Sequence, residues 1–191
     1  MRYIRAIILP ILIVSTIFSI NCFRDPGDID TGEHKAQTEP YYCLTNLSYC
    51  YNHHKDVDII NKYKDILWDD YYFYFDPKDV GKKVGEEGDE YIIPTSWNYE
   101  EDWQATQNMF ENTNSIKLEF PNTSKDNFYS SGDYNDDNTI FTIEDVEINL
   151  LVMVAPNFGY LAKGPCNFKF ELKDDGYWHM IIWEDRTAPE T

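Results

Sequence analysis

The sequence predicts an α+β fold, in which a curved antiparallel sheet wraps around about three N-terminal helices. Apolar residues recur at helical spacing up to Glu111 and alternate after it, so the helices come first and most strands follow. A length of 191 residues suits one domain, and 42% hydrophobic with 16% aromatic residues is typical of a packed core, not of a disordered chain. We therefore expect one domain over residues 39–187, followed by a short tail at 188–191.

The N-terminus has the order of an export signal. Met1–Arg5 is basic, and residues 6–20 are uncharged and mostly apolar, a segment shorter than the roughly 20 residues of a membrane-spanning helix. Ser19-Ile20-Asn21-Cys22 resembles the motif at which bacterial lipoproteins are cleaved and acylated. The resemblance implies a signal peptide at residues 1–21 and a lipid such as palmitate on Cys22, which would anchor the exported protein to a membrane of the cell envelope. A plain signal peptide or an uncleaved anchor is the alternative.

A tether and two helices are expected next. Residues 22–38 combine Pro, Gly and charges without an apolar period, which predicts a flexible tether between membrane and domain. Two short amphipathic helices follow, the second with Asp56 as its N-cap. The apolar stripes of these helices are Cys43, Leu44, Leu47, Cys50 and Tyr51 in the first, and Ile59, Ile60, Tyr63, Ile66 and Leu67 in the second.

The remaining elements are one helix and several strands. The aromatic run 71–75 predicts a strand that ends at Asp76-Pro77. Asn98 with Glu101 forms an Asn variant of the capping box, which predicts the start of a third helix. Alternating or β-branched runs predict the later strands, at residues 115–120, 139–154, 167–172 and 177–183.

The cysteines do not indicate a disulfide framework. If Cys22 carries a lipid, Cys43, Cys50 and Cys166 remain, which is an odd number. Cys43 and Cys50 lie seven residues apart on one predicted helix, roughly 10 Å along its axis and too far to bridge. Either could pair with Cys166, but we expect three buried thiols, because free cysteine packs as a small apolar residue.

Two segments are distinctive: "LWDDYYFYFDP" after the paired helices and "GYWHMIIWEDR" in the closing strand. With these segments and its order of elements, the chain resembles the nuclear transport factor two-like superfamily over about residues 40–186. The resemblance implies a cone-like, cystatin-like arrangement whose mouth takes a small apolar ligand. It also implies that a homodimer forms through the open face of the sheet.

The predicted strand 71–75 carries the first pocket candidates. Side chains alternate along a strand, so Tyr72, Tyr74 and Asp76 share one face. If that face lined the cone, burial would raise the pKa of Asp76 and make it a usable general base. The steroid isomerases of the same superfamily carry their base in a similar Asp-Pro, which implies a catalytic role for Asp76. The alternative is that Asp76 only begins a turn before Pro77.

A histidine and an acidic loop complete the candidates. His179 is the one histidine expected to reach a cavity, and a structural histidine satisfied by a neighbour is the alternative. In residues 133–144, Asp133, Asn135, Asp137 and Glu144 stand at positions 1, 3, 5 and 12 of a calcium-loop pattern. No helix is expected on either side of this loop, so a polar loop between strands is the alternative to a weak calcium site. No other cofactor is expected.

Charge excludes one class of partner and leaves three functions open. A formal net charge of −18 repels phosphate backbones, so we expect no nucleic acid partner. The favoured function is a membrane-anchored module that binds a small ligand in a conical domain. The alternatives are an isomerase, cyclase or lyase that uses Asp76 or His179, and an envelope interaction module with a filled cone and an exposed aromatic patch.

Overall fold

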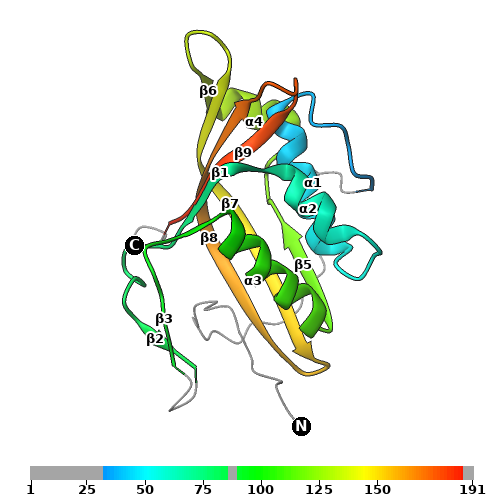
Figure 1. The fold of residues 1–191 in the computed structure, drawn as a ribbon, viewed down its shortest axis with the longest axis vertical. Helices are drawn as coiled ribbons and strands as arrows, with labels where there is room; N and C mark the ends of the chain where they lie inside the picture. Colours follow the sequence, from blue (N-terminus) through cyan, green and yellow to red (C-terminus); the bar gives the residue numbers. More distant parts are fainter. Residues whose placement is uncertain (1–31, 86–89, 187–191) are drawn as a thin grey trace.

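The computed structural model describes residues 32–85 and 90–186 as an α+β domain (Figure 1). The helices are α1 (Pro40–Asn52), α2 (Ile59–Ile66), α3 (Tyr99–Asn112) and α4 (Lys125–Ser131). The strands are β1 (Leu67–Tyr74), β2 (Lys83–Val84), β3 (Tyr91–Ile92), β4 (Ser96–Asn98), β5 (Ser115–Glu119), β6 (Gly132–Tyr134), β7 (Ile140–Ala155), β8 (Phe158–Leu172) and β9 (Trp178–Asp185). The predicted signal peptide, Cys22 and the tail at 188–191 lie outside the described residues.

One seven-stranded sheet organises the domain. Its strand order is β4-β1-β9-β8-β7-β5, and β6 pairs with β7. The neighbours are antiparallel except for β1 and β9, which run parallel with Tyr74 opposite Glu184. The predicted fold class is confirmed, and the parallel pair is the difference from an antiparallel sheet. It places the first and last long strands of the domain next to each other inside the sheet.

The helices pack against the sheet because their apolar stripes face it. Helix α1 is buried on nearly every side, and Ser48 on it donates a 2.7 Å hydrogen bond from Oγ to the carbonyl of Leu118 in β5. Asn52 holds the same residue through both its side-chain oxygen and its nitrogen. Helix α3 begins at the predicted capping box, since the Asn98 side chain accepts from the backbone of Glu101, whose own side chain accepts from the Asn98 backbone.

The space between the helices and the sheet is filled with large side chains. Tyr63, Tyr71, Phe168 and Phe170 are at most 1% exposed and belong to one continuous core cluster. Protein interiors pack at close to the density of organic crystals. These rings therefore occupy the interior of the cone as hydrophobic core. Cys43, Cys50 and Cys166 are free and buried within it, so the prediction of three buried thiols is confirmed.

Two local predictions are corrected, and one helix is added. The predicted tether to residue 38 is too long, because Gln37 is buried and donates a 2.7 Å hydrogen bond to the carbonyl of Trp178. The N-cap of α2 is Asp58 and not Asp56, because the chain turns there through a left-handed residue with φ of 67°. Helix α4 was not expected; Ser124 caps it by accepting a hydrogen bond from the backbone of Asn127.

Two smaller features complete the description. Strands β2 and β3 form a separate two-stranded hairpin, which projects from the end of β1 away from α1 and α2 (Figure 1). Among the described residues, no helix is both long enough and apolar enough to cross a membrane.

Candidate functional site

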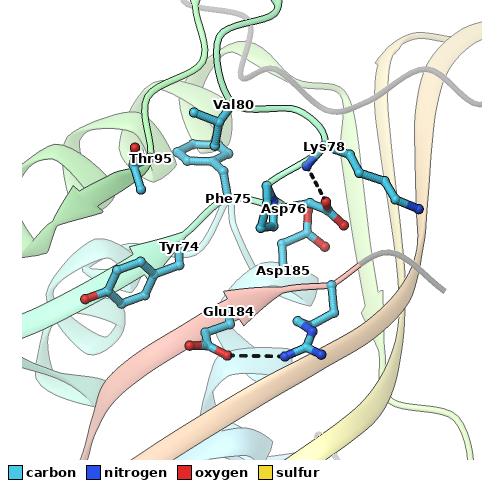
Figure 2. A pocket seen from close by; sticks show the side chains of 10 residues that line it. Tyr74, Phe75, Asp76, Lys78, Val80, Thr95, Glu184 and Asp185 are labelled. Carbon is cyan, nitrogen blue, oxygen red and sulfur yellow. Dashed lines mark hydrogen bonds and ion pairs between the residues drawn. The ribbon is translucent and has the colours of Figure 1, made fainter. Parts of the chain in front are cut away.

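A pocket lies where β1 and β9 end. We call it the β1–β9 pocket; its volume is about 760 Å³ (Figure 2). Its walls come from the end of β1 and the turn after it, from the segment before β4, and from the end of β9. The lining residues are Tyr74, Phe75, Asp76, Pro77, Lys78, Val80, Thr95, Glu184, Asp185 and Arg186.

The parallel pairing of β1 and β9 creates this pocket. Two parallel neighbours end at the same edge of a sheet, so residues that follow the two strands meet there. Asp76 follows β1, is only 4% exposed, and accepts a 2.7 Å hydrogen bond from the backbone N–H of Lys78. Asp185 is the last residue of β9. The two acidic groups are more than a hundred residues apart in sequence and become neighbours through the fold.

A second apolar cluster supports one wall. The ring of Phe75 packs edge-on against Trp97 at 4.7 Å and against Phe73 at 4.8 Å between centroids. Phe75 also donates a 3.1 Å backbone hydrogen bond to the carbonyl of Thr95. Ile93 and Ala105 complete the cluster, so this wall rests on β4 and α3. The apolar side of the pocket is therefore held by packing.

The floor of the pocket carries negative charge. Burial, together with the charges of Asp76 and Asp79, raises the pKa of Asp185 to about 6. Asp79 is buried too, and its carboxylate lies 2.5 Å from the ammonium of Lys82. Proximity of like charges with restricted solvent makes each further negative charge costly. The site thus favours a proton or a cation near Asp185.

The structure separates the four pocket candidates. Tyr74 and Asp76 line the β1–β9 pocket, whereas Tyr72 is 43% exposed outside its lining. The predicted alternation holds at Tyr71, which is fully buried in the core, and at the exposed Tyr72. It does not reach the end of the run, because Phe75 and Asp76 are both buried. His179 lies elsewhere, with Nδ1 3.0 Å from the carbonyl oxygen of Asp65 and Nε2 2.9 Å from Asp175. Both of its ring nitrogens are therefore engaged by the protein itself.

The acidic loop forms the tip of the β6–β7 hairpin. The side-chain oxygen of Asn135 accepts from the backbone of Thr139 and Ile140, and Asp137 accepts from Thr139. Asp133 belongs to β6 and Glu144 to β7, so the four residues Asp133, Asn135, Asp137 and Glu144 are spread over loop and strands. Across residues 32–85 and 90–186, no group of three His, Cys, Asp or Glu side chains is placed to hold a metal ion.

A buried carboxyl group in the core was not anticipated. Asp102 on α3 is 4% exposed, and its carboxyl accepts from the hydroxyl of Tyr63 at 2.5 Å and from that of Tyr71 at 3.5 Å. Burial raises the pKa of Asp102 to about 7, although both tyrosines act to lower it. The spacing from Asp102 to the buried Thr106 and Met109 would have placed it on the apolar stripe of the helix. An acidic residue on the apolar stripe of this helix is the sequence signal that would have identified Asp102.

Comparison with known proteins identifies the fold. No protein-family model matches the chain, and no curated protein sequence does. A nuclear transport factor 2-like superfamily protein from Salmonella enterica serovar Typhimurium matches in structure with a TM-score of 0.52 and 7% identity, over 78% of this chain and 89% of that one. A protein from Novosphingobium aromaticivorans, provisionally described as a scytalone dehydratase, matches with a TM-score of 0.51 and 11% identity, over 78% and 83%. At these identities the likeness shows a shared nuclear transport factor 2-like fold.

Proposed function

We propose that this protein is a membrane-anchored lipoprotein of the cell envelope whose domain binds a small, partly apolar ligand in the β1–β9 pocket. The lipid on Cys22 and the segment up to about residue 33 would hold the domain near the membrane. The pocket is the observation that carries the proposal. Its volume of about 760 Å³ falls within the roughly 300–1,000 Å³ of small-molecule sites.

The composition of the pocket supports the same proposal. Apolar side chains with a few polar groups are typical of ligand sites, because apolar walls supply affinity and polar groups fix orientation. Here Tyr74, Phe75 and Val80 provide the apolar surface, and Asp76 and Asp185 provide the polar groups. The interior of the cone is a weaker choice, since Tyr63, Tyr71 and their neighbours already fill it.

Catalysis has less support than binding. Asp76, the base that the resemblance implied, lies in the pocket and accepts a hydrogen bond from the turn that follows it. His179 does not line that pocket, so these two residues do not form an acid–base pair there. The dehydratase likeness is one of fold and adds no residue to the site.

An interaction module of the envelope is the second candidate. The filled cone favours it, and so do exposed apolar side chains along the β7–β8 hairpin. Leu151 and Leu161 pair across these strands and are 37% and 45% exposed, and Phe158 at the hairpin end is 55% exposed. A partner protein or a second copy of the chain would cover this surface.

Native mass spectrometry of the full-length protein, released gently from a neutral detergent, tests the proposal. We expect a co-purifying small molecule, or thermal stabilisation by members of a lipid and metabolite panel. Tyr74→Ala should remove that mass or stabilisation, whereas Tyr177→Ala, a matched change at an exposed residue outside the lining, should not. Absence of any ligand and of any stabilisation would favour the interaction module.

A further inference from the structure

The charges around the β1–β9 pocket are not balanced. Three carboxyl groups line the pocket, those of Asp76, Glu184 and Asp185, and the charge of Asp79 also acts on Asp185. Two of these four groups have a cation: Lys82 lies 2.5 Å from Asp79, and Arg186 lies 4.0 Å from Glu184. Within the part of the chain that the structure describes, Asp76 and Asp185 form no ion pair. In Figure 2 the side chain of Lys78 extends away from both carboxyl groups. Asp76 and Asp185 thus have no cationic partner among residues 32–85 and 90–186.

These two groups also repel each other. The charge of Asp76 acts on Asp185, whose carboxyl is largely removed from solvent, and it contributes to raising the pKa of Asp185 to about 6. The carboxylate of Asp76 receives a hydrogen bond from the Lys78 backbone, which stabilises the charge without neutralising it. A cation placed between the two carboxylates would remove this repulsion and gain two charge-assisted hydrogen bonds.

The adjoining wall is suited to the apolar part of the same ligand. Phe75 is fixed by Trp97 and Phe73, and Val80 stands on the turn above it. Aromatic rings favour cations at their faces, and an apolar chain or ring gains free energy by leaving water on such a wall. One side of the pocket is thus anionic and the other apolar.

We propose that the ligand of the β1–β9 pocket is an amine: an ammonium group held by Asp76 and Asp185, attached to an apolar group that packs on Phe75 and Val80. This inference rests on the proposed function and narrows its ligand to one chemical class. A neutral ligand of the same shape would leave the two carboxylates uncompensated. A carboxylate ligand would add a further negative charge to the floor.

Three matched probes test the inference on the full-length protein in a neutral detergent. Isothermal titration calorimetry at about pH 7.5 compares 3-phenylpropylamine, 3-phenylpropanol and 3-phenylpropanoate, which share one apolar group. We expect the amine to bind at least about tenfold more tightly than the alcohol, and the carboxylate to bind most weakly. Lowering the pH to about 5 should weaken the amine alone, because Asp185 then takes up a proton.

A pair of variants tests whether Asp185 is responsible for the preference for the amine. Asp185→Asn should lower the affinity for the amine by about tenfold and leave the alcohol unchanged, whereas Asp174→Asn, an equal charge change at an exposed residue outside the lining, should alter neither. A melting curve for each variant checks its fold. If a variant does not fold, the three probes and the pH series on the unmodified protein still decide.

The outcomes separate this inference from the proposed function. Equal binding of amine and alcohol, or tightest binding of the carboxylate, would overturn the amine inference and leave a ligand pocket in place. If no probe binds and no ligand co-purifies, the proposed function fails with it.

Discussion

Asp102 on α3 is a carboxylic acid buried in the interior of the domain. Its carboxyl group is buried among Tyr63, Tyr71 and apolar neighbours, and it contacts no cation among the described residues. The neutral acid fits this environment, because burial penalises the charged form. Two tyrosine hydroxyls donate to it and partly offset the penalty.

This residue makes the stability of the domain depend on pH. The pKa of Asp102 is about 7 in the folded chain and near 3.8 without the fold, so the folded state binds the proton more tightly. The stabilisation is complete below about pH 4 and is lost as the pH rises through 7. Because a tenfold difference in proton affinity corresponds to about 1.4 kcal/mol, the loss is on the order of a few kcal/mol.

Asp102→Asn should remove this dependence, because the amide does not ionise. As the pH rises from 4 to 8, the unmodified protein should lose stability that the variant does not lose. We therefore expect the difference in free energy of unfolding between the two proteins to shift in favour of the variant. Urea denaturation followed by tryptophan fluorescence across this range measures the difference. Asp174→Asn is the control at an exposed site, and parallel curves for Asp102→Asn and the unmodified protein would contradict the assignment.

Among the elements, α3 connects the interior to the β1–β9 pocket. The helix carries Asp102, Met109 and Phe110 toward the main core and Ala105 toward the cluster that supports Phe75. Its start is fixed by the capping box of Asn98 and Glu101, directly after β4. The position of one cap therefore affects both the core and the wall of the pocket.

Asn98→Ala should destabilise the domain by about 1 kcal/mol, since two backbone N–H groups of the first turn lose their acceptor. Thermal unfolding followed by circular dichroism measures this loss. Asn98→Asp, which keeps the acceptor, should retain most of the stability. An equal loss in both variants would show that the side chain acts by some means other than capping.

For the whole molecule, the sequence predicts the fold better than it predicts the site. Local patterns are sufficient for α3, whose start follows from Asn98 and Glu101, but they leave open which face of the strand at 71–75 is buried. They are insufficient for the pairing of β1 with β9, because the choice of a strand partner depends on contacts between distant segments. Asp76 could be named as a candidate, but Asp185 becomes one only when that pairing brings the two together.

The proposed membrane anchor involves Cys22, which precedes the folded domain in sequence, so it is tested on the whole chain. Cys22→Ser removes the thiol that would carry the lipid, so we expect the protein to leave the membrane fraction while its melting temperature stays unchanged. Cell fractionation with immunoblotting measures the release from the membrane, and a thermal melt measures the melting temperature. Continued membrane retention of Cys22→Ser would point to an uncleaved anchor.

The pairing of β1 with β9 also fixes when the protein can finish folding. Leu67 lies opposite Met180, so β1 has no partner on that side until nearly the whole chain has been synthesised. Contacts between segments so far apart in sequence form slowly, because a long loop must close first. A chain still emerging from the ribosome lacks β9, the strand that joins β1 to β8, and stays open. For a protein that we propose to be exported, the last strand thus delays folding until the chain is complete.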